Sequence, residues 1–391
     1  MKLVWVSHSG SARGGAELAL CEAAKELVSK GVAVNAVLPW RGDLAERLEG
    51  VGVDVDVKFF CSWVERRGAH RRMQRFAYNV KAARAFAQHI NSIGADVVVS
   101  NTLASPFGAL AAAFARRPHV WYVHELFSQP GHEIYFDFGN RLSLSIMKRF
   151  SDIIIVNSQT VFNQFQKWMP TDKLRLVYYG IEVPSIERGQ SHEPRALNLI
   201  HVGRLSFGKR QEDAVRAVAI LARRGLDVRL TLLGDEMPTY GPLLRKLCSE
   251  LGVEQRVQFV PFADNRFNHM AAADCLVMCS KGEAFGRVTV EAMKLGKPVV
   301  GAQSGGTAEL IRHGETGLLF RVGDAEDLAT KLESLYHDRS LLNELGLRAR
   351  KWANDNFDVK KYGNELIQVL TAAIDMRTSA ESLSHAPSKI F

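Results

Sequence analysis

Cysteine is scarce in this chain of 391 residues, which contains five, an odd number. None of the spacings typical of metal ligands occurs among Cys21, Cys61, Cys248, Cys275 and Cys279. Cys275 and Cys279 flank an apolar Leu-Val-Met run, where packing is the ordinary role of a cysteine. The sequence therefore predicts a protein of the reducing cytosol rather than one held together by disulfides.

Long hydrophobic runs are also lacking. No segment reaches the ~18 uninterrupted apolar residues that a membrane-spanning helix needs. The chain enters an apolar strand at Leu3–Val6 without a charged leader or a cleavage site. We expect a cytoplasmic protein that meets a membrane, where it does so, peripherally at the inner face of the cytoplasmic membrane.

The common nucleotide-binding fingerprints are missing. The glycines of the first loop, Gly10, Gly14 and Gly15, fit neither G-x-G-x-x-G nor a Walker motif. A glycine-rich turn that opens a helix still lets the backbone approach a phosphate, although it is as often only a turn. No D-x-D follows a strand end, since Asp54 and Asp56 lie within a strand-like run. We therefore expect no metal ion.

What the sequence does contain is a regular alternation of apolar runs and amphipathic stretches. With 47% hydrophobic residues, a chain of this length has material for two domains. The predicted strands of the first half are Leu3–Val6, Val32–Leu38, Val53–Val57, Asp96–Ser100, His119–Val123 and Ile153–Val156. Those of the second half are Leu197–Val202, Val228–Leu233, Val257–Val260, Cys275–Met278, Val299–Ala302 and Leu318–Phe320. Helical patterns between them predict α/β domains with doubly wound parallel sheets, whose ligands lie beyond the carboxyl ends of the strands.

The most informative stretch is residues 283–291. Glu283 precedes a helix predicted from Val288 to Leu295, and Glu291 lies within it. The backbone N–H groups around Phe285–Arg287 are those of a helix N-terminus, which attracts phosphate. Carboxylates beside them suit a sugar joined to a phosphate, although two glutamates near a helix start can also be ordinary partners of the helix dipole.

Two cations follow the strand Leu197–Val202. Arg204 offers a fork that matches a phosphate, and Lys209 offers a point charge. Taken alone, the two could equally be a surface pair. His124 and Glu125 follow the strand His119–Val123, where a functional role and that of an ordinary loop residue are both open.

A basic stretch without acids runs from Arg66 to Arg84, within an aromatic-rich segment 58–84, in a chain of net charge +8. It could be a solvated helix face, or it could bind an anionic membrane, a phosphorylated acceptor or nucleic acid. We rank the membrane above nucleic acid and expect no nucleic-acid partner.

Three motifs occur together in order. The first is Gly-Gly-Ala-Glu, and the second is V-G-R-L-x-x-x-K. The third is E-x7-E with an internal Phe-Gly, followed directly by A-M-x-x-G-K-P-V-V. The set resembles the signature of retaining glycosyltransferases of family 4. The resemblance implies the GT-B fold: two Rossmann-like doubly wound domains facing a cleft. It implies an acceptor-side domain at residues 1–184, a donor-binding domain at 185–356, and a helix at 357–377 that crosses back. The tail 378–391 is predicted to be disordered.

The resemblance also implies roles for single residues. Arg204 and Lys209 would stabilise the departing β-phosphate, with backbone amides near Phe285, Gly286 and Arg287. Glu291 would bind the ribose and Glu283 a hydroxyl of the donor sugar. His124 would support the transferred sugar, and Gly14 and Gly15 would face the diphosphate and the acceptor. The catalytic set is therefore Glu283, His124, Arg204 and Lys209.

The chain departs from the family pattern at two positions. Tyr179 replaces the usual Asn, a change that we expect to affect turn chemistry rather than catalysis. Arg210 replaces a usual Gly after Lys209, so that an additional positive charge is expected near the phosphates.

The implied function is metal-independent transfer from a nucleoside-diphosphate sugar, UDP or GDP type, to a hydroxyl of a saccharide or lipid-linked acceptor. Cell-envelope polysaccharide or glycolipid biosynthesis is the expected setting. Two alternatives stay open: a nucleotide-sugar epimerase of similar fold, and a non-catalytic protein that binds anionic glycolipid.

Overall fold

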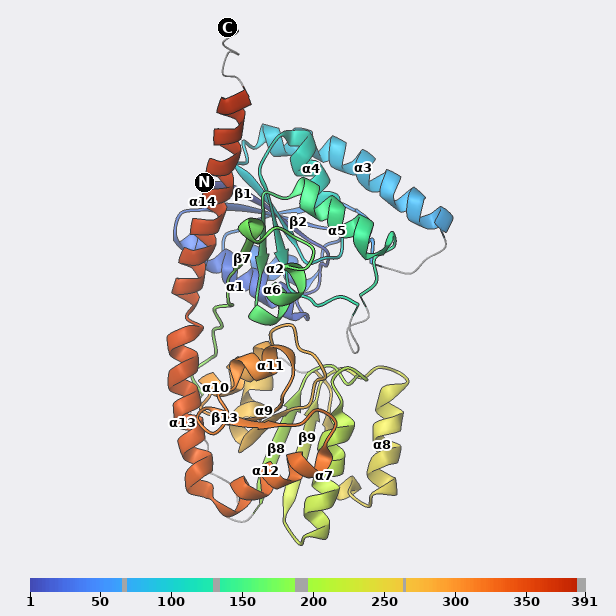
Figure 1. Ribbon diagram of the computed structural model, residues 1–391, viewed down its shortest axis with the longest axis vertical. Helices are drawn as coiled ribbons and strands as arrows, with labels where there is room; N and C mark the ends of the chain where they lie inside the picture. Colours follow the sequence, from blue (N-terminus) through green and yellow to red (C-terminus); the bar gives the residue numbers. More distant parts are fainter. Residues whose placement is uncertain (65–68, 129–133, 187–195, 263–264, 385–391) are drawn as a thin grey trace. The chain divides into compact units, whose positions relative to one another are not determined.

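The computed structural model describes residues 1–64, 69–128, 134–186, 196–262 and 265–384 and divides them into two compact units (Figure 1). Unit 1 comprises residues 1–128, 134–180 and the chain from Val359 onward. Unit 2 begins at Ile181 and ends at Asp358. In sequence, unit 2 is thus inserted into unit 1.

Unit 1 is built on a parallel sheet with the strand order β3-β2-β1-β4-β5-β6-β7. Its strands are β1 Lys2–Ser7, β2 Ala33–Leu38, β3 Asp54–Val57, β4 Val97–Asn101, β5 His119–Val123, β6 Ile153–Val156 and β7 Leu174–Leu176. The six predicted strands are confirmed within one or two residues. The short edge strand β7 was not predicted, because Arg175 interrupts its apolar pattern.

Helices cover both faces of this sheet (Figure 1). They are α1 Gly15–Ser29, α2 Asp43–Glu49, α3 Ala69–Ser92, α4 Phe107–Ala115, α5 Gly139–Phe150, α6 Gln159–Phe165 and α14 Val359–Ser384. Helix α1 packs against α2 and α14, whereas α3 packs against α4. The Tyr122 hydroxyl of β5 lies 2.9 Å from that of Tyr362, so α14 is anchored in unit 1 although it follows unit 2.

The last helix is longer than predicted. The prediction ended it at residue 377, but α14 continues to Ser384, and only residues 385–391 of the expected disordered tail lie outside the described residues. The hydroxyls of Thr378 and Ser379 donate to the carbonyls of Ile374 and Asp375, so both polar groups are hydrogen-bonded within the helix. Between Arg377 and Pro387 the sequence contains no glycine or proline that would end the helix.

Unit 2 contains a second parallel sheet with the order β10-β9-β8-β11-β12-β13. The strands are β8 Leu197–Val202, β9 Val228–Leu233, β10 Val257–Val260, β11 Cys275–Met278, β12 Val299–Ala302 and β13 Gly317–Phe320. The helices are α7 Gln211–Arg223, α8 Tyr240–Glu250, α9 Arg266–Ala272, α10 Arg287–Lys294, α11 Gly305–Leu310, α12 Ala325–His337 and α13 Arg339–Asn356. The predicted pair of doubly wound α/β domains is confirmed.

The ends of unit 2 are tied together. The Ile181 amide donates to the carbonyl of Phe357 at 3.1 Å, and Lys294 Nζ donates to both the Ile181 and Phe357 carbonyls at 2.6 and 2.9 Å. Contacts therefore place the boundary at 180/181 and 358/359 rather than at the predicted 184/185 and 356/357. The reason is that Ile181 is fully buried in unit 2.

No helix in the described part of the chain combines the length and the apolar character needed to cross a bilayer.

Candidate active site

The glycine-rich loop of unit 1 joins β1 to α1. A Cβ on Gly10 would lie 2.3 Å from the Trp40 carbonyl oxygen, and one on Gly14 would lie 2.1 Å from Glu17 Oε2. Close packing against backbone therefore requires glycine at position 10, whereas a side chain at position 14 would displace the carboxyl group of Glu17. Gly14 precedes α1 and Gly15 is its first residue, which leaves the helix N-terminus in this loop. That Gly14 and Gly15 face a diphosphate stays a prediction.

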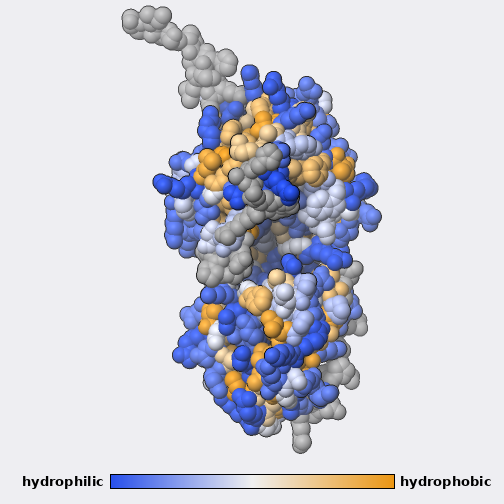
Figure 2. All heavy atoms as spheres, turned by 90° about the vertical axis from the view of Figure 1, so that its right-hand side faces the viewer, coloured by the Kyte–Doolittle hydropathy of each residue, from blue (hydrophilic) through white to orange (hydrophobic). Residues whose placement is uncertain are grey.

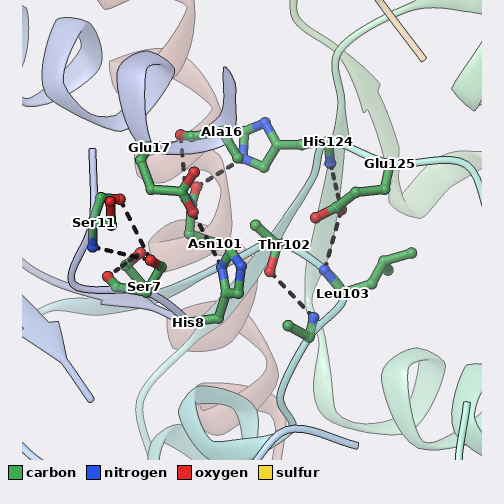
Figure 3. Close-up of polar contacts among 12 residues, drawn as sticks. Ser7, His8, Ser11, Ala16, Glu17, Asn101, Thr102, Leu103, His124 and Glu125 are labelled. Atoms are coloured by element: carbon green, nitrogen blue, oxygen red, sulfur yellow. Dashed lines mark hydrogen bonds and ion pairs between the residues drawn. The ribbon is translucent and has the colours of Figure 1, made fainter. Parts of the chain in front are cut away.

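Five polar side chains gather where β1, β4 and β5 end, and we call His8, Glu17, Asn101, His124 and Glu125 the strand-end cluster (Figure 3). Asn101, the last residue of β4, links its members: its Oδ1 lies 2.7 Å from His124 Nε2, and its Nδ2 donates to the Ala16 carbonyl at 3.3 Å. The cluster thus connects the predicted sugar-contacting histidine to the glycine-rich loop.

The His124 ring is fixed from both sides. Nδ1 lies 2.5 Å from the Tyr179 hydroxyl, which also accepts a hydrogen bond of 2.7 Å from Asn157 Nδ2. Because Nε2 points at Oδ1 of the Asn101 side chain, the network favours the histidine tautomer that is protonated at Nε2. Both ring nitrogens are engaged, so the imidazole is held rigidly at the strand end.

Tyr179 was expected to affect turn chemistry rather than catalysis, and the structure adds a contact of its side chain with the strand-end cluster. Its ring stacks on His124, with centroids 5.7 Å apart, and contacts Tyr362 edge-on. Its hydroxyl orients the histidine. Tyr179 is therefore a positioning residue for His124, which no local motif revealed because 55 residues separate the two.

The carboxyl groups of the cluster are unusual. Burial raises the pKa of Glu17 to about 7. Burial also raises the pKa of Glu125 to about 7, although its Oε2 accepts from the His124 and Leu103 amides, and the charge of Glu17 adds to the effect. His8 Nδ1 lies 3.3 Å from Glu17 Oε1, and burial lowers the pKa of His8. At neutral pH His8 is thus neutral and each carboxyl group is divided between its two protonation states.

In unit 2, the loop after β8 meets the loop before α10. Lys209 Nζ donates to Glu283 Oε1, and the Ser280 hydroxyl donates to the same oxygen at 2.8 Å. The structure therefore joins Lys209 and Glu283, 74 residues apart, in one charged contact. Arg204, in the same loop as Lys209, is exposed, and no described residue forms an ion pair or hydrogen bond with its guanidinium.

Glu291 lies between two arginines. Its Oε1 is 3.4 Å from Arg266 Nη2 and 3.7 Å from Arg287 Nη2, and the carboxylate is almost fully buried. Its Oε2 has no hydrogen-bond partner among the described residues, which leaves an acceptor open for a ligand. Arg266 begins α9 and was missed by the sequence analysis, because nothing in its local pattern distinguishes it from a surface cation.

The turn between Glu283 and α10 has a demanding backbone. Gly286 precedes the helix with φ +100°, a left-handed conformation that favours glycine. Phe285 is buried and meets Phe357 edge-on at 5.7 Å. Below it, a Cβ on Gly306 would lie 2.3 Å from the Phe285 carbonyl oxygen, and the Gly306 amide donates to the Glu283 carbonyl. The Gly305–Gly306 pair therefore supports this turn by direct backbone contact.

Arg210 does not add a free positive charge beside Arg204 and Lys209, as the sequence suggested. Its guanidinium forms two hydrogen bonds with Asp213, at 2.7 and 2.8 Å. Arg210 directly precedes α7 in a left-handed conformation, and this geometry directs its side chain to the first turn of the helix. The positive charge of Arg210 is therefore paired with the carboxylate of Asp213.

A buried histidine lies beneath the charged contact. His201, in β8, has no accessible surface, and burial together with the charge of Lys209 lowers its pKa to about 4. Neither ring nitrogen has a hydrogen-bond partner among the described residues. His201 is thus a neutral group beside Lys209 and Glu283 that the sequence analysis did not select.

No group of three or more His, Cys, Asp or Glu side chains within the described ranges could hold a metal ion. Asp54 and Asp56 lie in β3 as predicted, where Asp56 accepts from Asn35 and pairs with His89. Independence from metal stays a prediction.

The predicted site residues thus form two sets. Gly14, Gly15 and His124 lie at strand ends of unit 1; Arg204, Lys209, Glu283 and Glu291 lie with Phe285, Gly286 and Arg287 in unit 2.

Comparisons with known proteins cover both units. Residues 13–183 match the family described as Glycosyltransferase Family 4, and residues 185–352 match the family described as Glycosyl transferases group 1. The chain is 30% identical to N-acetyl-alpha-D-glucosaminyl L-malate synthase of Bacillus anthracis over 57% of this chain and 61% of that enzyme. It is also 30% identical to the lipopolysaccharide core biosynthesis glycosyltransferase LpsE of Rhizobium meliloti, over 60% of this chain and 68% of the relative.

Solved structures extend the similarity to nearly the whole chain. Anabaena Alr3699/HepE in complex with UDP superimposes with a TM-score of 0.78 at 26% identity, covering 95% of this chain and all of that one. The same protein in complex with UDP-glucose gives a TM-score of 0.77.

Proposed function

Because this chain belongs to the family-4 glycosyltransferases and has their GT-B fold, we propose that it transfers a sugar from a nucleoside-diphosphate sugar to an acceptor hydroxyl group, with retention of configuration. UDP is the proposed nucleotide, since Alr3699/HepE was solved with UDP and with UDP-glucose at 26% identity. The acceptor is a saccharide or a lipid-linked saccharide, in polysaccharide or glycolipid synthesis. The relative LpsE, named for lipopolysaccharide core biosynthesis, supports this setting.

One observation carries the proposal: Lys209 and Ser280 contact Glu283, and the loop that holds Lys209 also carries the exposed Arg204. When a donor binds, Lys209 and Arg204 stabilise the negative charge that grows on the β-phosphate, and the N-terminus of α10 adds backbone donors. Glu283, held by Ser280, accepts a hydrogen bond from a sugar hydroxyl. Glu291, held by Arg266 and Arg287, accepts from the ribose through its open Oε2.

The proposed reaction proceeds on one face of the sugar. The bond from the anomeric carbon to the β-phosphate oxygen breaks, and its electron pair leaves with the nucleoside diphosphate. The acceptor oxygen bonds to the anomeric carbon on that same face, and its proton passes to the departing phosphate. Two cations take over the charge stabilisation that a metal ion would otherwise supply, so no metal is required. His124 supports the transferred sugar.

The first experiment measures release of nucleoside diphosphate from UDP-, GDP- and ADP-sugars in the presence of EDTA, with and without a lipid extract. We expect release from a UDP-sugar that the extract stimulates, and NMR of the product should show the retained anomer. Conversion of the donor alone into another nucleotide sugar would indicate an epimerase. Absence of both turnover and donor binding would contradict the enzyme and favour a glycolipid-binding protein.

We propose further that unit 1 attaches peripherally to an anionic membrane on the cytoplasmic side, through α3. Arg72 and Arg75 turn inward and pair with Asp137, so these two do not belong to the basic surface. Arg71, Lys81 and Arg84 are exposed. Figure 2 shows apolar residues interspersed with charged ones on the face of unit 1 that carries α3 and α5. The large apolar side chains exposed in this region are Phe59, Met73, Tyr78 and Leu142. This mixture suits insertion among anionic headgroups.

Replacing Arg71, Lys81 and Arg84 together by glutamate is expected to abolish co-sedimentation with phosphatidylglycerol-containing vesicles. Each basic residue near such a surface contributes about 1 kcal/mol, so three losses weaken partitioning by about 10²-fold or more. The matched control replaces Arg348, Arg350 and Lys351 of α13, exposed cations of unit 2, by glutamate. An equal loss of vesicle binding in the control variant would mean that the effect depends on net charge and not on α3. Equal binding of the wild-type protein to neutral phosphatidylcholine vesicles would contradict the proposal.

A further inference from the structure

The strand-end cluster of unit 1 contains two carboxyl groups whose capacity to accept hydrogen bonds is only partly filled by the described residues. Glu17 Oε1 is buried and lies 3.3 Å from His8 Nδ1 (Figure 3), but no described residue donates a hydrogen bond of good geometry to it. Glu125 Oε2 accepts hydrogen bonds from the His124 and Leu103 amides at 3.2 and 3.3 Å. An unpaired buried carboxyl oxygen costs stability, which a ligand that donates hydrogen bonds would restore.

We propose that this cluster binds a neutral, hydroxyl-rich acceptor, whose hydroxyl groups donate hydrogen bonds to the carboxyl oxygens of Glu17 and Glu125, and that it disfavours an acceptor carrying a phosphate or carboxylate there. The inference rests on the proposed function and names the substrate class of its acceptor side. It concerns the part of the acceptor that enters the cluster, not a distant lipid anchor.

The charges of the cluster support a neutral ligand. The two carboxyl groups lie close enough for Glu17 to raise the pKa of Glu125. An anion placed close to either carboxylate would be repelled, and more strongly in a partly desolvated site than in a fully hydrated one. Hydroxyl groups meet no such repulsion, and their hydrogen bonds to a charged acceptor are stronger than those to a neutral one.

The two histidines of the cluster do not supply a compensating positive charge. Burial keeps His8 neutral at physiological pH, and its Nδ1 lies beside Glu17, which leaves Nε2 as the other polar atom of a partly exposed ring. Both nitrogens of His124 are engaged by Asn101 and Tyr179. Arg13, in the same loop, is exposed.

The backbone preserves this arrangement. A side chain at Gly14 would collide with Glu17 Oε2, at 2.1 Å from its Cβ, so only glycine allows the carboxyl group of Glu17 to fold back against the start of α1. The Asn101 amide holds the same loop through the Ala16 carbonyl. Glu17 is thus placed by the loop itself, and a ligand meets a preorganised carboxyl group.

The test compares octyl β-D-glucoside with octyl β-D-glucuronide, which differ by one carboxylate, as acceptors or as competitors of transfer to the lipid extract. The wild-type enzyme is expected to use or bind the glucoside at least about tenfold better. Glu17→Gln and Glu125→Gln should each raise KM for the glucoside about tenfold, with a smaller change in kcat and an unaltered Kd for the donor nucleotide sugar. Glu46→Gln, an exposed carboxylate of α2, is the matched control.

Preference for the glucuronide, or a lower KM for it in the glutamine variants, would overturn the inference, as would no interaction with either glycoside. Glycoside preference in the wild type needs no variant, so misfolding of a variant leaves the test intact. If the wild-type protein turned over no nucleotide sugar at all, the proposed function would be refuted instead. Failure of the acceptor inference and failure of the proposed function can therefore be distinguished.

Discussion

Replacing Lys209 by alanine is expected to lower kcat/KM for sugar transfer by about 10²–10³-fold, the usual effect of removing one preorganised group that stabilises transition-state charge. Lys209 contacts Glu283, and the exposed Arg204 lies in the same loop, so the lysine contributes charge and also positions the carboxylate. Steady-state kinetics with saturating acceptor measures the loss. Because the charge develops as the phosphate departs, kcat should fall more than donor affinity.

Two comparisons make this result specific. Arg204→Ala should reduce kcat in the same direction, and Lys209→Arg should restore part of the activity because the charge is kept. Lys246→Ala serves as control, since this exposed lysine of α8 forms a surface pair with Glu250. Full activity in Lys209→Ala would refute the role of this lysine, and equal loss in Lys246→Ala would show a general effect of charge.

Replacing Asp137 by alanine is expected to destabilise unit 1 by about 3–5 kcal/mol, the cost of leaving a buried ion pair with one partner. Asp137 is almost fully buried and pairs with Arg75, whose side chain is 14% exposed. The backbone carbonyl of Asp137 also accepts a hydrogen bond of 2.9 Å from Arg72. Without the carboxylate, Arg75 retains a charge in a poorly hydrated place. Urea unfolding monitored by tryptophan fluorescence measures the loss.

The neighbouring cations of α3 provide the control. Arg71→Ala, at an exposed position, should change stability by less than about 0.5 kcal/mol. The double variant Arg75→Ala with Asp137→Ala should be less destabilised than the sum of the single variants, because it buries no unpaired charge. Additive losses would mean that the two side chains do not interact, and stability unchanged in Asp137→Ala would refute the buried pair.

The sheets could be predicted because each strand is an apolar run between turns. β5, β6, β8 and β9 begin and end at the predicted residues, since buried parallel strands leave little choice of side chain. The same reasoning missed β7, whose three residues make too short a pattern. The predicted end of α14 was too early, because Thr378 and Ser379 resemble tail residues in the sequence, although their hydroxyls donate to carbonyls of the preceding helical turn.

The candidate site shows the same division. Arg204, Lys209, Glu283 and Glu291 could be selected because each lies in a motif at a strand or helix end. Arg266 and Tyr179 could not, because each acts on a residue far along the chain, 25 residues away for Arg266 and Glu291. Arg210 was assigned a wrong role for a similar reason: its competing partner, Asp213, belongs to a helix start whose geometry the sequence does not reveal.

The insertion of unit 2 into unit 1 affects the order in which a ribosome can complete the protein. Tyr122 is synthesised 240 residues before Tyr362, the partner that its hydroxyl meets in α14. All of unit 2, whose two ends meet at Ile181 and Phe357, emerges in between. The part of the chain made first is therefore finished last, and until α14 emerges, the apolar surface of α1 that it covers needs protection from aggregation.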